Sequence, residues 1–77
     1  MIDIEKLHTT PMGIDRIRRN LSLDIEDVVT WCKEAVRTTD TSAIYRQGKN
    51  WYVTGDGFVL TINAHSHTII TAHKSKP

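Results

Sequence analysis

His73 is the residue whose type and position most directly suggest acid–base chemistry. It lies beside Lys74 at the end of a segment rich in β-branched residues. An imidazole next to an ammonium group at a strand end could give or take a proton near neutral pH. The alternative, which we favour from the sequence, is a partly buried edge histidine bonded to a backbone carbonyl.

Arg46 lies in the one segment where cations are interleaved with aromatic side chains. Its neighbours along the chain are Tyr45, Lys49, Trp51 and Tyr52. A surface that stacks bases and pairs phosphates needs such a mixture, so Arg46, Lys49 and Tyr52 are candidate nucleic-acid contacts. Adjacent strand residues face opposite sides, which sends at least one aromatic of each pair into the core. A hydrophobic layer with a solvated rim is therefore the favoured interpretation.

The other histidines and the single cysteine give weak support for a metal site or a nucleophile. His65 and His67 flank a predicted tight turn, while His73 lies about 20 Å from His67 at roughly 3.3 Å per strand residue. The three histidines therefore cannot all bind one ion. Cys32 falls in a predicted apolar stripe, where cysteine behaves as a small hydrophobic residue. We predict no metal and no cofactor.

Two helices are expected before any strand. Thr9-Thr10-Pro11 is a helix-start signal, because a threonine hydroxyl can cap the helix and proline suits its first position. This helix should end near Asn20. A second helix is predicted from a cap at Asp24 to about Arg37. Its apolar stripe contains Ile25, Val28, Val29, Cys32 and Val36.

The remaining segments predict four strands, at residues 43–46, 50–54, 57–64 and 68–74. Short connections between them require an antiparallel meander. A two-residue turn at His65-Ser66 would place two sets of residues on the same face. The first set is Phe58, Leu60 and Ile62, and the second is Ile69, Thr71 and His73. We predict an α+β fold with two N-terminal helices packed on this sheet.

Composition bounds the class of protein. The chain has 77 residues, of which 39% are hydrophobic, and a formal charge of +1, so we expect a single domain over residues 1–77. Residues 1–40 carry six Lys or Arg against eight Asp or Glu, and residues 41–77 carry four against one. No segment is apolar enough for a membrane span and the start lacks a secretory signal, so we expect a cytoplasmic protein without a membrane partner.

Six segments spread along the chain carry a resemblance to a known family. They are Leu7-His8-Thr9-Thr10, Gly13 with residues 16–21, Asp27-Val28-Val29, Trp31-Cys32-Lys33, Gly48-Lys49-Asn50-Trp51-Tyr52 and residues 69–74. Through them the sequence resembles a family of short microbial proteins catalogued only as a domain of unknown function. The resemblance covers nearly the whole chain and implies no activity.

A looser similarity, in the order of elements and the ending Ile-Thr-Ala-His, is to the barnase, colicin and RelE-like group of metal-independent ribonucleases and toxins. That resemblance implies His73 as catalytic acid or base and Arg46 as catalytic phosphate ligand, with Lys74 a weaker contact to nucleic acid. The chain departs from the group because it is only faintly basic and has no evident carboxylate base on the sheet.

Three functions remain open at this point. The favoured one is a protein-binding module, of adaptor or inhibitor type, that uses an exposed sheet face or edge. The alternative is a ribonuclease-like protein acting through His73 and Arg46 on RNA. The third is a non-catalytic nucleic-acid binder or a homo-oligomer, since an exposed edge strand also permits a homodimer. The residues leave it open whether the protein is an enzyme.

Overall fold

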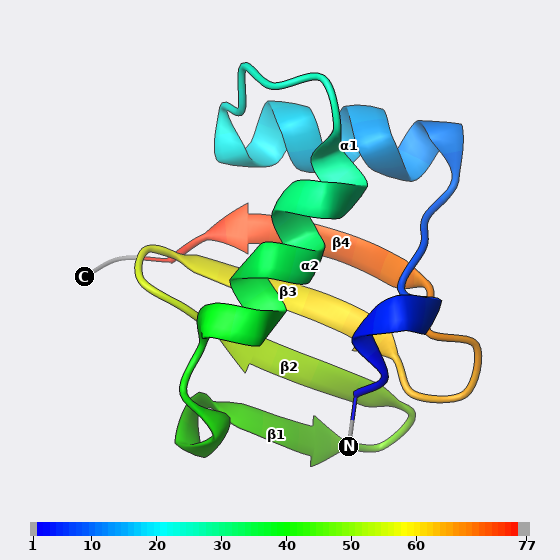
Figure 1. Cartoon of the computed structure of the whole chain (residues 1–77), viewed down its shortest axis with the longest axis vertical. Helices are drawn as coiled ribbons and strands as arrows, with labels where there is room; N and C mark the ends of the chain where they lie inside the picture. Colours follow the sequence, from blue (N-terminus) through cyan, green and yellow to red (C-terminus); the bar gives the residue numbers. More distant parts are fainter. Residues whose placement is uncertain (1, 76–77) are drawn as a thin grey trace.

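The computed structural model describes residues 2–75, which form two helices and a four-stranded sheet (Figure 1). The α+β fold with both helices before the sheet is confirmed. In chain order the elements are η1 (Ile4–Lys6), α1 (Pro11–Leu21), α2 (Val28–Thr38), η2 (Thr41–Ala43), β1 (Ile44–Gln47), β2 (Asn50–Thr54), β3 (Phe58–Asn63) and β4 (Ile69–Lys74). In this part of the chain no helix is long and apolar enough to cross a membrane.

Helix α1 begins where the sequence predicts and extends one residue beyond the predicted end. The Thr10 hydroxyl accepts a hydrogen bond from the Gly13 amide at 3.0 Å, and Pro11 occupies the first turn. The helix continues through Leu21 because the left-handed backbone of Ser22, with φ of 54°, is what ends it.

The predicted start of α2 at Asp24 is wrong. Asp27 is the cap, and its carboxylate accepts from both the amide and the hydroxyl of Thr30, at 3.0 and 2.7 Å. The Arg18 guanidinium donates to the carbonyls of Ile25 and Glu26. These two carbonyls therefore accept a side-chain hydrogen bond and do not take part in the first turn of the helix. Ile25 is therefore an exposed loop residue and does not belong to the apolar stripe.

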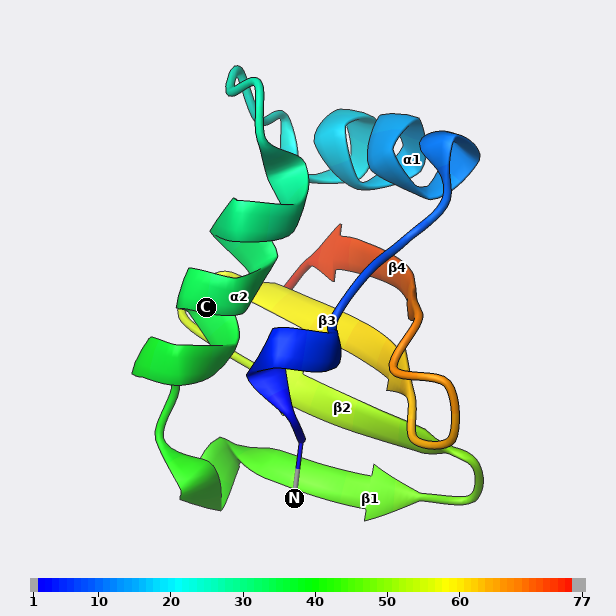
Figure 2. The same ribbon diagram turned by 45° about the vertical axis from the view of Figure 1, so that its right-hand side comes forward.

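The sheet is the predicted antiparallel meander, with strand order β1-β2-β3-β4. Gly48 and Lys49 connect β1 to β2 as a two-residue turn, in which Gly48 has a φ of +61°. Glycine at the first position of such a turn adopts this conformation without strain. Both helices lie on the same side of the sheet (Figures 1 and 2).

The last hairpin corrects the predicted register. Its connection has four residues, 64–67, since the Asn63 amide donates to the Thr68 carbonyl at 2.8 Å. Ile69 pairs with Ile62 but Thr71 pairs with Thr61, so Ile70 is an extra residue in a β-bulge. The bulge reverses the alternation. Ile69 faces the helices as predicted, whereas Thr71 and His73 face the opposite side.

One cluster of apolar side chains fills the space between helices and sheet. Val53, Leu60, Ile62 and Ala72 have no measurable exposure, and the Trp31 and Phe58 rings meet edge to face beside them. The other buried members of the cluster are Leu7, Ile17, Leu21, Val28, Cys32, Ala35, Val36 and Ile69.

The two edges of the sheet differ. The N-terminal segment lies along β4, where His8 forms a parallel bridge to Thr68 and accepts from the Ile69 amide at 2.7 Å. Side chains of Thr9 and Asn20 donate to further carbonyls of β4. No pattern in the sequence indicates this contact along β4. Among residues 2–75, no such segment covers β1, which leaves the sheet one free edge.

Candidate functional site

The side of the sheet away from the helices is a surface that neither helix covers (Figure 1). The register and the alternation of side chains assign ten strand residues to it. We name this surface the open sheet face, and its residues are Tyr45, Gln47, Asn50, Tyr52, Thr54, Val59, Thr61, Asn63, Thr71 and His73. It contains hydroxyl, amide and aromatic groups, and no Lys, Arg, Asp or Glu.

Two tyrosines form the most prominent feature of the open sheet face. Tyr45 and Tyr52 are directly opposite each other on β1 and β2, and their rings stack with centroids 5.3 Å apart and planes 21° apart. Tyr45 is 50% exposed. Thr61, next to Tyr52 in the register, is only 8% exposed although no helix lies over it. The surface around Thr61 is therefore already packed, which makes it a preformed platform.

His73 lies on the open sheet face, opposite Val59. The favoured sequence interpretation, a partly buried histidine bonded to a carbonyl, is wrong. The side chain is exposed, and it makes none of the hydrogen bonds found among residues 2–75. The bulge at Ile70 is the physical reason, because it turns His73 away from the helices.

Arg46 lies on the other side of the sheet from His73. Its guanidinium carbon is 5.9 Å from the centre of the Trp51 ring, and its Nε donates to the Gly48 carbonyl at 3.1 Å. β1 and β4 are the two outermost strands, so their backbones are separated by roughly 14 Å at the usual strand spacing. The structure does not bring Arg46 and His73 together.

The other predicted nucleic-acid contacts also divide between separate places. Tyr52 shares the open sheet face with His73, while Lys49 is in the β1–β2 turn close to Arg46. Lys74 is opposite Phe58 on the helix side, where it lines a shallow depression with Leu21. No single surface holds all five candidate residues.

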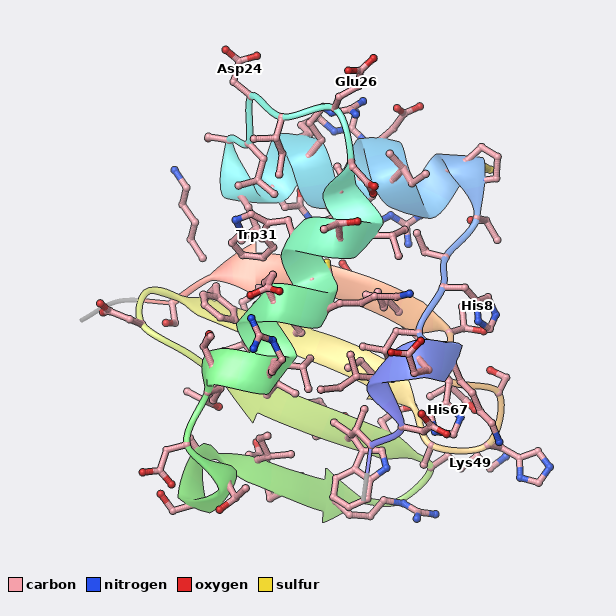
Figure 3. All side chains as sticks on the ribbon, in the orientation of Figure 1. His8, Asp24, Glu26, Trp31, Lys49 and His67 are labelled. Atoms are coloured by element: carbon pink, nitrogen blue, oxygen red, sulfur yellow. The ribbon has the colours of Figure 1, made fainter. Side chains whose placement is uncertain are left out.

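A second candidate site, which the sequence analysis did not identify, lies between two turns. A solvent-open hollow of about 540 Å³ is lined by Arg46, Lys49, Asn63, His65 and Ser66. We name it the basic hollow. The predicted meander could have indicated this site. In an antiparallel meander, the first and third turns lie at the same end of the sheet, which brings Lys49 and His65 to one end. Figure 3 shows Lys49 near this end, with His67 and His8 on the same side of the molecule.

Cys32 and the histidines do not form further chemical sites. Cys32 is fully buried, and burial raises the pKa of its thiol to about 12, which keeps it protonated and unreactive. Across residues 2–75, no group of three or more His, Cys, Asp or Glu side chains is placed to hold a metal ion.

Comparison with protein families shows which family the chain matches. The model of the family described as "Protein of unknown function (DUF3781)" matches residues 1–73, which is nearly the whole chain. No curated protein and no solved structure matches the chain.

Proposed function

The chain belongs to the family described as "Protein of unknown function (DUF3781)", and from that premise we propose that it is a protein-binding module whose partner docks on the open sheet face. The single observation that carries this proposal is the stacked pair Tyr45–Tyr52 on a sheet face that no helix covers. Tyrosines are enriched among the residues that dominate binding energy at protein interfaces.

The charge of the open sheet face supports a protein partner over a nucleic acid. Its ten residues include no Lys or Arg, and a phosphate backbone requires such cations for most of its affinity. Depletion of charge together with aromatic side chains is typical of a protein interface core. His73 is the one histidine on this face and adds a polar group at its margin.

The edges of the sheet indicate how far the partner extends. β4 is covered by the bridge of His8 to Thr68, so a partner strand cannot pair there without displacing the N-terminal segment. β1 is free, and Tyr45 lies on it. A partner seated on the tyrosine pair can therefore also contact the backbone of β1.

The positions of His73 and Arg46 do not favour RNA cleavage by this pair. Those two side chains lie on opposite faces of the sheet and on its two outermost strands. A general acid or base and a phosphate ligand must both reach one scissile phosphate.

The proposal is tested with a double variant, Tyr45→Ser with Tyr52→Ser, used as bait in extracts of the native cells. The matched control is Met12→Ser, which removes a 73%-exposed apolar side chain from α1. We expect a specific partner to be retained by the wild type and by the control, with at least a tenfold weaker affinity for the double variant.

Hydrogen exchange of the purified complex then locates the contact. Protection concentrated in β1 and β2 supports the proposal. Equal binding by wild type and double variant, or protection confined to the helices, contradicts it. Sedimentation of the chain alone tests whether the tyrosines bind a second copy. Self-association that is lost in the double variant would contradict the proposal of a separate protein partner on this face.

A further inference from the structure

The basic hollow has the composition of an anion site. Its five residues supply a guanidinium, an ammonium, an imidazole, an amide and a hydroxyl, and none of them carries a carboxylate. The three ion pairs within residues 2–75 are all elsewhere, on η1, α1 and α2. Arg46 and Lys49 are therefore not neutralised by any acidic side chain of the described residues.

Arg46 is held in position by two contacts. The Nε hydrogen bond to the Gly48 carbonyl fixes one edge of the guanidinium, and its central carbon lies over the Trp51 ring, 5.9 Å from the ring centre. Neither terminal nitrogen, Nη1 or Nη2, donates to any other group of residues 2–75. An oriented guanidinium with both terminal nitrogens free suits two-point contact with an oxyanion.

The two turns that form the hollow are fixed relative to each other. The Ala64 amide donates to the Lys49 carbonyl at 2.8 Å, which ties the third turn to the first. Within the third turn, the Asn63 carboxamide oxygen accepts from the amides of His65 and Ser66, both at 2.9 Å. These bonds place the cations and the hydroxyl around one space before any ligand arrives.

We propose that the basic hollow binds a phosphate group. The Arg46 guanidinium would contact two phosphate oxygens, Lys49 would supply a mobile point charge, and the His65 imidazole would donate from the opposite turn. The Ser66 hydroxyl lines the hollow but is already hydrogen-bonded to Asn63 and Thr68. This site is separate from the open sheet face, and its test does not depend on the protein partner proposed above.

The test is a titration of the full chain with pyrophosphate, followed by ¹H–¹⁵N spectra at constant ionic strength. We expect saturable shifts of the backbone amides of Lys49, Ala64, His65 and Ser66, with sodium chloride giving none. The double variant Arg46→Gln with Lys49→Gln should weaken binding by at least about tenfold, since each charge-assisted contact contributes substantially.

The matched control removes two positive charges from another surface. Arg16 and Arg19 are exposed on α1 and take part in none of the ion pairs of residues 2–75. Arg16→Gln with Arg19→Gln should change the pyrophosphate affinity by less than about twofold. These two charges do not line the hollow, and salt screens their effect on a ligand bound there. Equal weakening by the two double variants, or shifts that do not saturate, would overturn the proposal.

A second arm identifies the source of the phosphate. A single-stranded RNA octamer is titrated in the same way. If the phosphate belongs to a small molecule, pyrophosphate binds at least as tightly as RNA, and the shifts stay around the hollow. If it belongs to an RNA backbone, the octamer binds more tightly with a steep salt dependence. Both results require loss of binding in the Arg46→Gln, Lys49→Gln variant.

Discussion

The two faces of the sheet are built from alternate residues of the same four strands, yet they have opposite characters. Toward the helices, Val53 and Leu60 are fully buried in an apolar cluster. On the other side, their neighbours in the chain are Tyr52, Thr54, Val59 and Thr61, which form part of an uncharged surface. Neither helix lies on that side of the sheet (Figure 2).

This difference separates stability from recognition. The covered face removes apolar area from water, and that burial provides most of the free energy of folding. The open sheet face has no covering element and, apart from the packed Thr61, its side chains are less buried, so its exposed groups can serve a binding role. The comparison therefore predicts large losses of stability from substitutions on one face and small losses on the other.

The largest expected effect is that of Leu60→Ala. It should lower the free energy of unfolding by about 2–5 kcal/mol, since it removes a fully buried side chain and leaves a cavity. Urea unfolding followed by the fluorescence of Trp31 and Trp51 measures the loss. Thr54→Val, an exposed substitution on the open sheet face, should change the same quantity by less than about 0.5 kcal/mol.

A milder substitution keeps this prediction measurable, because a chain of this length has a free energy of unfolding of only about 4–12 kcal/mol. If Leu60→Ala prevents folding, Ile62→Val can be measured in its place. Ile62→Val should lower the free energy of unfolding by about 0.5–1.5 kcal/mol. Equal losses in the free energy of unfolding from substitutions on the covered and open faces would show that the open face also stabilises the fold.

The second prediction concerns Cys32, which lies in α2 against the covered face. In the folded chain its reaction with an aromatic disulfide reagent at pH 8 should be at least about a hundredfold slower than in urea, because the pKa of the buried thiol is raised to about 12. The thiol is neutral when folded, so its contribution to stability is complete below the unfolded pKa.

That contribution should be lost as the pH rises through a window from about 9 to about 12, because only the unfolded thiol ionises in that range. Cys32→Ala should remove this pH dependence and serves as the control. Rapid labelling of the folded chain would contradict the burial that distinguishes the covered face.

The third prediction tests which aspartate anchors α2 over the sheet. Asp27→Ala should lower the melting temperature by about 5 °C, whereas Asp24→Ala should leave it nearly unchanged, because only Asp27 accepts from Thr30. Hydrogen bonding by Thr30 lowers the pKa of Asp27, so its stabilisation is present above the unfolded pKa and fades as the pH falls through the folded one. Thermal scans at pH 7 and pH 3 measure both effects, and equal shifts in the two variants would restore Asp24 as the cap.

The fold was predictable because its signals are local. Thr10-Pro11 begins α1, and the change from helical to alternating spacing after Thr38 separates helices from strands. The choice between Asp24 and Asp27 was not predictable, because both are good caps and the hydrogen bonds of Arg18 and Thr30 decide between them.

The candidate sites were less predictable because they depend on contacts between distant residues. The bulge at Ile70 has no recognisable sequence signal, because it lies in a run of β-branched residues. It nevertheless determines which face of the sheet His73 lies on. The edge contact of His8 with Thr68 joins residues 60 positions apart. The basic hollow requires the register of both hairpins before Lys49 and His65 can be placed together.

The smallest expected effect is the coupling between Tyr45 and Tyr52. A double-mutant cycle with Tyr45→Ser and Tyr52→Ser should give an interaction energy of about 0.5–1 kcal/mol for unfolding, typical of an exposed cross-strand aromatic pair. Urea unfolding of the four proteins measures it. A coupling above about 2 kcal/mol would assign the stack a structural role. A small coupling energy together with at least a tenfold loss of partner affinity would distinguish the two faces most clearly. The tyrosine pair would then be nearly dispensable for folding but required for binding.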